Sequence, residues 1–198
     1  MQTEIEAKFL NIDHDAMRAK LTSLGAYLER SDRLMRRQNY DFPDKRLNAL
    51  HAWARLRDEG DKITLTYKQL QDRGLHGTKE VNIIVDSFEQ ADKLLQALGL
   101  SVHTYQETRR ESWTLNGVQI ELDQWPWIKP FLEIEGPTEN SVRLTAKLLG
   151  LDWDVAVHGS VEIAYQAEYD VTEAEIDAWP EILFTPVPDD LEKKRRKS

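Results

Sequence analysis

The chain has 198 residues, a formal net charge of -9 and no cysteine, and 40% of its residues are hydrophobic. This composition predicts one globular domain, or one domain with an added tail. Disulfides, thiolate metal sites and cysteine nucleophiles are excluded, and the negative charge argues against a nucleic-acid-binding surface. No apolar run approaches the ~18 residues of a membrane-spanning helix, and no signal segment opens the chain, so we expect a cytoplasmic protein without a membrane partner.

Alternation of polar and apolar residues predicts about eight strands. In the first of them, Glu4, Glu6 and Lys8 would share one face and the apolar residues between them the other, because successive side chains of a strand point to opposite faces. The predicted strands cover 2–10, 27–42, 52–57, 63–68, 78–85, 102–115, 118–124 and 131–136. Hairpin turns are predicted at 58–61 and at Asn116-Gly117.

Helices are predicted between these strands from capping residues, apolar spacing and terminating glycines. They cover 13–24, the stretch from 86 or 87 to 99, the stretch from 140 or 141 to 149, and two shorter segments at 160–169 and 172–179. A loop is expected at 71–77. Residues 192–197 form a basic tail, which we expect to be a disordered, solvated end.

Strands joined by hairpins and short loops, with a few interposed helices, predict an antiparallel α+β architecture. A closed eight-stranded β-barrel with flanking helices is favoured, because many strands carry charge on one face and apolar residues on the other. The apolar faces would meet helices outside, and the charged faces would line a polar interior.

The charged positions follow a repeated spacing. Acidic pairs at i and i+2 occur in three strands, as Glu4/Glu6, Glu121/Asp123 and Glu133/Glu135. Basic residues occur in others, as the pair Arg55/Arg57 and singly as Lys68, Lys79 and Arg109. Clustered carboxylates suit Mg²⁺ or Mn²⁺, and neighbouring guanidiniums suit phosphates, so together they describe a polyphosphate site. The alternative is a set of solvated strand faces with cross-strand salt bridges.

The segment Glu4-Ile5-Glu6-Ala7-Lys8 is similar to the ExExK signature of the CYTH superfamily, the triphosphate tunnel metalloenzymes. The resemblance runs from residue 1 to about 170, and the downstream features follow in the same order: Asn39-Tyr40-Asp41-Phe42-Pro43, Arg55-x-Arg57, Lys68, Lys79-Glu80, Arg109, Glu121-x-Asp123 and Glu133-x-Glu135. It implies a tunnel domain over 1–170 that binds a triphosphate with divalent metal. A C-terminal helical extension and basic tail would cover 171–198.

The resemblance also implies roles for individual residues. The metal ligands would be Glu4, Glu6, Glu133 and Glu135, helped by Glu121 or Asp123. The phosphate-binding residues would be Lys8, Arg55, Arg57, Lys68, Lys79 and Arg109. The residues expected to be catalytic are Glu4, Glu6, Lys8 and Arg57. Trp53 lies on the same strand face as Arg55 and could stack on a thiamine or nucleobase ring.

Three positions depart from the family's pattern. Glu107 stands where many members have a Lys two residues before the Arg matched by Arg109, which reduces phosphate affinity unless Arg110 or Lys79 substitutes. Lys129 replaces a common Gly, and Glu162-Ile163-Ala164-Tyr165 replaces the usual Lys-Ser-Tyr.

The leading hypothesis is metal-dependent hydrolysis of a small-molecule triphosphate, with inorganic triphosphate the simplest substrate. Thiamine triphosphatase is the first alternative, followed by class IV adenylate cyclase and by a non-catalytic polyphosphate or nucleotide binder. We expect a monomer or a homodimer.

Overall fold

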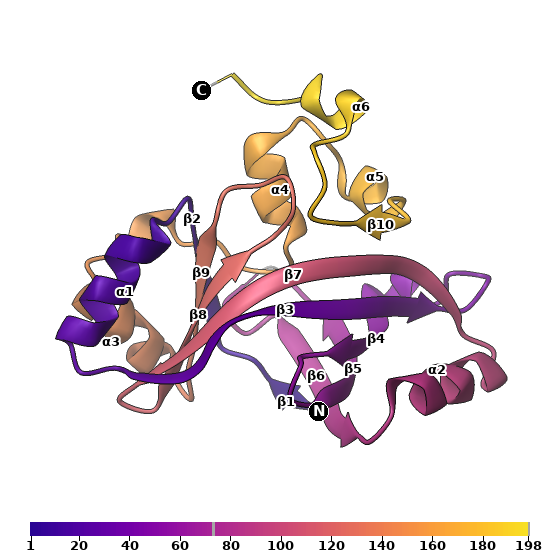
Figure 1. The fold of residues 1–198 in the computed structure, drawn as a ribbon, viewed down its shortest axis with the longest axis horizontal. Coiled ribbons are helices and arrows are strands. Elements are labelled where there is room, and N and C mark those ends of the chain that lie inside the picture. The colour runs from indigo at the N-terminus through magenta and orange to yellow at the C-terminus, as the bar shows by residue number, and fades with distance from the viewer. Residues whose placement is uncertain (73, 198) are drawn as a thin grey trace.

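One strongly curled β-sheet organises the chain in the computed structural model, which describes residues 1–72 and 74–197 (Figure 1). Its strands are β1 (Gln2–Thr3), β2 (Glu6–Leu10), β3 (Tyr27–Asp41), β4 (Ala52–Asp58), β5 (Ile63–Leu70), β6 (Thr78–Val85), β7 (Ser101–Leu115), β8 (Val118–Gln124), β9 (Phe131–Glu135) and β10 (Glu181–Ile182). The helical elements are α1 (His14–Ser23), η1 (Asn48–Leu50), α2 (Phe88–Ala97), α3 (Glu139–Leu149), η2 (Trp153–Val155), α4 (Glu162–Glu168), α5 (Glu173–Asp177) and α6 (Asp189–Glu192).

All eight predicted strand segments are present, the first of them divided into β1 and β2, and local chemistry explains their connections. The Asn116-Gly117 turn has positive φ at both residues, 53° and 77°, as a two-residue hairpin requires. Asp13 caps α1 and Ser87 caps α2, as predicted, whereas α3 is capped by Thr138, slightly earlier than expected. Arg73, in the predicted loop 71–77, and Ser198, at the end of the predicted tail, lie outside the described residues.

The prediction of a closed barrel is wrong. The sheet runs in the order β1-β6-β5-β4-β3-β7-β8-β9-β2, and β10 pairs with β7. β1 and β2 are the two ends of this order, and they are successive segments of one chain that separate at Glu4-Ile5, where Glu4 N donates to Thr78 O at 3.0 Å and Gly136 N donates to Ile5 O at 3.1 Å. The first predicted strand is therefore split between two edges, and the described residues form an antiparallel half-barrel.

Apolar residues on the convex face of the sheet hold the flanking helices. Leu21 of α1 and Val142 of α3 pack with Phe9, Ile120 and Ile134, which alternate with charged residues along β2, β8 and β9. A second cluster joins α2 to β3, β4 and β5 (Figure 1). Because the apolar side chains of these strands are used outside, their polar side chains face the concave side.

The C-terminal segment packs on the sheet instead of trailing into solvent. Ile176, Ile182 and Leu191 share a core with Trp125 and Tyr165, and β10 runs parallel to β7. Backbone bonds join the basic tail to the end of α4, from Asp170 N to Lys194 O and from Arg196 N to Glu168 O, both at 2.8 Å. This corrects the expectation of a disordered tail through residue 196, while the domain boundary at residue 170 stays a prediction.

Each helix in the described ranges is too short or too polar to cross a membrane.

Two leucines on the flanking helices test this arrangement. Leu21 is 0% exposed beneath α1, and Leu144 on α3 is 52% exposed. Leu21→Ala is expected to lower the free energy of unfolding by about 2–5 kcal/mol because it leaves a cavity, whereas Leu144→Ala should change it by less than ~0.5 kcal/mol. Urea denaturation at pH 7 measures both, and equal losses would contradict the placement of α1 on the core.

Candidate functional site

The concave face of the sheet encloses a cavity of about 500 Å³ in which acidic and basic side chains alternate. Its acidic lining includes Glu4, Glu6, Glu59, Glu80, Glu121, Glu133 and Glu135. Its basic lining includes Lys8, Arg33, Arg37, Arg55, Arg57, Lys68 and Arg110. Most of the residues predicted from spacing are therefore brought together, although they come from strands far apart in the sequence.

Cross-strand neighbours form the acid–base pairs on one side of the cavity. Lys8 lies opposite Glu133 in the β2–β9 ladder, and its Nζ is 3.2 Å from Glu133 Oε1 and also contacts Glu6. Lys68 donates to Glu4 at 2.7 Å and lies 3.4 Å from Glu80, its partner in the β5–β6 ladder. Each lysine thus holds carboxylates on two sides.

Arg110 joins two of the predicted metal-ligand positions. Its Nε and Nη2 donate to Asp123 at 2.7 and 2.6 Å, and Nη2 also donates to Glu133 at 2.7 Å. Asp123 is 0% exposed and is not among the cavity-lining residues. Both oxygens of Asp123 bind Arg110, so this carboxylate orients the guanidinium and is poorly placed as a metal ligand.

The structure places Arg109 and Lys79, two of the predicted phosphate-binding residues, outside the lining of the cavity. Arg109 and Trp113 lie an even number of residues apart on β7 and therefore point to the same face, where Trp113 packs in the outer core. The guanidinium of Arg109 pairs with Asp32. Lys79 is adjacent to the cavity-lining Glu80 on β6 and therefore points to the opposite face. Arg110 is the β7 cation that enters the cavity, and the apolar residue Trp113 was the signal that could have identified it.

The same register changes the meaning of the departure at Glu107. This carboxylate lies on the outer face, where Glu107 Oε1 is 3.6 Å from Arg36 Nε. The interior residue two positions before Arg110 is Thr108, which is fully buried and accepts a hydrogen bond from Arg37.

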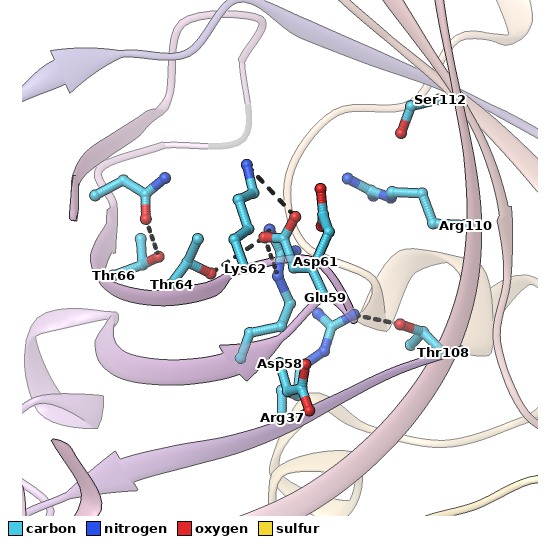
Figure 2. A network of polar contacts seen from close by, with 12 residues as sticks. Arg37, Asp58, Glu59, Asp61, Lys62, Thr64, Thr66, Thr108, Arg110 and Ser112 are labelled. Carbon is cyan, nitrogen blue, oxygen red and sulfur yellow. Dashed lines mark hydrogen bonds and ion pairs between the residues drawn. The ribbon is translucent and has the colours of Figure 1, made fainter. Parts of the chain in front are cut away.

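Glu59 is a site residue that sequence analysis missed, because it lies in the predicted β4–β5 turn. It is only 3% exposed and accepts hydrogen bonds from Arg57 Nε at 3.0 Å, Arg30 Nη1 at 3.2 Å and Thr64 Oγ1 at 3.1 Å. Figure 2 shows its carboxylate among Lys62 and Thr64. Alternation gave no signal here, since a turn has no fixed inward face.

Burial and like charge disturb the carboxylates that could hold a metal. Burial raises the pKa of Glu121 to about 7. Burial, with Glu4 and Glu80 nearby, also raises the pKa of Glu135. Burial opposes ionisation of Glu133 as well, but Lys8 and Arg110 hold its pKa well below the usual range.

The donor set fits a hard divalent cation, although no metal-binding group of three or more His, Asp or Glu is preformed among the described residues. Glu121 Oε2 is buried and has no hydrogen-bond partner. Carboxylates close enough to raise one another's pKa carry an excess of negative charge, which a cation bound by oxygen ligands neutralises.

Trp53 also lines the cavity, as predicted from its place beside Arg55. Ile176 and Ile182 of the C-terminal segment line it as well. The lining of the cavity therefore includes apolar residues, which a purely inorganic ligand does not need.

These features define a class: proteins that enclose a polyanion site, rich in both carboxylates and guanidiniums, on the concave face of a curled antiparallel sheet. The chain belongs to the CYTH domain family, whose family model matches residues 2–163. No curated protein matches the chain.

Solved structures share the fold. A Pyrococcus horikoshii protein is 25% identical with a TM-score of 0.64, over 77% of this chain and 93% of that one. An adenylate cyclase candidate from Vibrio parahaemolyticus is 16% identical with a TM-score of 0.73, over 83% and 98%. A candidate adenylyl cyclase from Hippeastrum, described as having a dominant triphosphatase activity, is 14% identical with a TM-score of 0.58, over 91% and 97%.

The Glu59 network predicts a pH-dependent contribution to stability. Burial raises the pKa of Glu59, but Arg57 and Lys62 outweigh it and lower the pKa from 4.5 to about 2. Because folding lowers this pKa, the ionised carboxylate stabilises the protein at pH values above 4.5, the pKa in the unfolded chain. This contribution is lost as the pH falls toward 2. Glu59→Gln should therefore cost on the order of 3 kcal/mol at pH 7, and the deficit should shrink at pH 3.

Urea denaturation at the two pH values measures this deficit. Glu89→Gln, which removes an exposed pair with Lys93 on α2, is the control and should cost at most ~0.5 kcal/mol. A Glu59→Gln deficit of the same size at pH 7 and pH 3 would show that the carboxylate charge is not responsible.

Proposed function

We propose that the protein hydrolyses a phosphoric anhydride bond of inorganic triphosphate with the help of Mg²⁺ or Mn²⁺. The observation that carries this proposal is the cavity in which acidic and basic side chains of strands β2 to β9 face one another. Catalysis of phosphoryl transfer is largely positioning and charge neutralisation, and both kinds of group are needed for it.

The carboxylates of Glu4, Glu6, Glu133 and Glu135, with Glu121 beside them, would hold the metal. The bound cation would supply neutralisation of the phosphate charge. Lys8 and Lys68 pair with these carboxylates in the structure. Once a divalent cation neutralises the carboxylates, the same lysines can turn to phosphate oxygens.

The remaining cations would bind and orient the substrate. Arg55 and Arg57 lie on the cavity side of β4, and Asp123 and Glu59 fix the guanidiniums of Arg110 and Arg57. Oriented guanidiniums make bidentate contacts with phosphate. Water would attack the terminal phosphorus, and the anhydride P–O bond would break to give phosphate and diphosphate. Glu121 Oε2, which makes no hydrogen bond, is one acceptor available to orient that water.

An organic triphosphate, such as thiamine triphosphate, is the second candidate. Trp53, Ile176 and Ile182 are apolar members of the lining, and the indole of Trp53 could stack on an aromatic ring. The triphosphatase activity named for the Hippeastrum structure belongs to that protein and is compatible with both candidates.

Phosphate release from tripolyphosphate tests the proposal. We expect release with Mg²⁺ or Mn²⁺ and none in excess EDTA, because the carboxylate-rich part of the cavity needs a cation before it can accept an anion. Thiamine triphosphate in the same assay ranks the two candidates by kcat/KM. A folded protein that releases no phosphate with either metal from either substrate would contradict the proposed activity.

Adjacent arginines on β7 test the inward face. Arg110→Gln should lower kcat/KM for tripolyphosphate by about 10- to 100-fold, the range for a charge-assisted hydrogen bond. Arg109→Gln, on the outer face with Asp32, should leave it within about two-fold. Circular dichroism confirms that both variants are folded, and a larger loss for Arg109→Gln would reverse the assignment.

A further inference from the structure

Two neutral side chains in the cavity have polar atoms that bind nothing in the described part of the chain. Thr104 of β7 is only 6% exposed and lines the cavity, and its Oγ1 is buried without a hydrogen-bond partner. Asn39 of β3 also lines the cavity, and its Oδ1 is buried without a partner. The two residues lie opposite each other in the β3–β7 ladder. Burying a polar group without a hydrogen bond is costly, so two such groups side by side indicate a ligand that supplies the bonds.

The position of this pair suits the organic part of a substrate. On one side, Gln106 is the next inward residue of β7 after Thr104, and Ile182 of β10 lies beside it, 1% exposed and in the cavity lining. On the other side, Asn39 lies opposite Arg55 in the β3–β4 ladder. The pair is therefore located between a cation and an apolar cover, where a group joined to a phosphate chain would lie.

The atoms themselves limit the chemistry of the ligand. Asn39 Oδ1 can only accept a hydrogen bond, whereas the Thr104 hydroxyl can donate or accept. Ionised phosphate oxygens also only accept, so they cannot satisfy Asn39 Oδ1. An amino group on a heterocycle supplies the donor, and the ring nitrogen beside it supplies an acceptor, which is the edge that asparagine reads in adenine.

We propose that Asn39 and Thr104 form a subsite for an amino-substituted heterocycle at the organic end of a triphosphate substrate. The amino group donates to Asn39 Oδ1, the adjacent ring nitrogen accepts from the Thr104 hydroxyl, and Ile182 covers the ring. This inference rests on the proposed function, and within it on the second candidate, an organic triphosphate. The aminopyrimidine of thiamine triphosphate and the adenine of ATP both carry this edge.

Calorimetric titration of the full-length protein in Mg²⁺ with two pairs of diphosphates tests the subsite. One pair is thiamine diphosphate and its analogue with a carbonyl in place of the amino group, and the other is ADP and IDP. Diphosphates lack the third phosphate, so binding is measured without the proposed reaction. The amino ligand of at least one pair should bind about 3- to 10-fold more tightly than its carbonyl partner, the range for one neutral hydrogen bond.

The pair that shows this difference identifies the heterocycle. Equal affinities within both pairs, or no binding of any of the four ligands, would overturn the subsite.

Two variants assign the preference to these residues. Thr104→Val and Asn39→Ala should each remove the preference for the amino ligand. Thr114→Val is the matched control, because Thr114 lies on the same strand but outside the cavity lining, and its hydroxyl bonds to Glu29. It should keep the wild-type preference. A preference that persists in both Thr104→Val and Asn39→Ala would overturn the assignment.

Thermal melting separates binding from a structural role. Without ligand, Thr104→Val should melt at or above the wild-type temperature, because it removes a buried hydroxyl that has no partner. A hydroxyl that stabilised the fold would give a lower melting temperature, which would contradict the subsite.

Failure of the subsite and failure of the proposed function give different results. If the wild type hydrolyses tripolyphosphate but does not distinguish amino from carbonyl ligands, the subsite is wrong and the hydrolase proposal stands. If the wild type prefers the amino ligand through Asn39 and Thr104 but releases no phosphate from any triphosphate, the subsite stands and the hydrolase proposal is wrong.

Discussion

Charge on the inner faces of the strands is the constraint on which the rest of the structure depends. Ala7, Phe9, Ile120, Leu132 and Ile134 turn outward to cover α1 and α3, and alternation then forces their charged neighbours into the concave side. These charges are tolerated on the concave side because adjacent strands carry charges of opposite sign. The Lys8–Glu133 and Lys68–Glu80 neighbours of the ladders are the simplest examples.

Most of the inward-facing residues could be predicted from sequence, because strict alternation in a short strand allows only one assignment of residues to the two faces. In β2, β4 and β9 the inward residues were identified correctly, since a shift of one position would have buried Glu6, Arg55 or Glu133 in the outer core. In β7 two arginines are adjacent, and charge alone cannot choose between them. The outward Trp113 decides for Arg110, which shows that apolar positions determine register better than charged ones.

Other residues were beyond this kind of reasoning. β3 shifts register between Leu28 and Arg30 and again between Arg30 and Arg33, so parity cannot be carried along it to Arg37. Glu59 lies in a turn, and its contacts with Arg57, Arg30 and Thr64 make it an interior residue. The prediction of a closed barrel failed for a similar reason. The N-terminal segment leaves β6 and joins β9 at Glu4-Ile5, and this change of partner depends on backbone hydrogen bonds with residues far away in sequence.

The two parts of the cavity have opposite imbalances of charge, and this supports the proposal that it binds a metal–polyphosphate complex. Burial, and then repulsion from Glu4 and Glu80, raises the pKa of Glu135, so acidic groups are in excess in that part. Around Arg37 the repulsion comes from Arg55 and Arg57, so that part lacks negative charge. A ligand that carries a divalent cation at one end and phosphate oxygens at the other removes both repulsions together, and each ion then favours binding of the other.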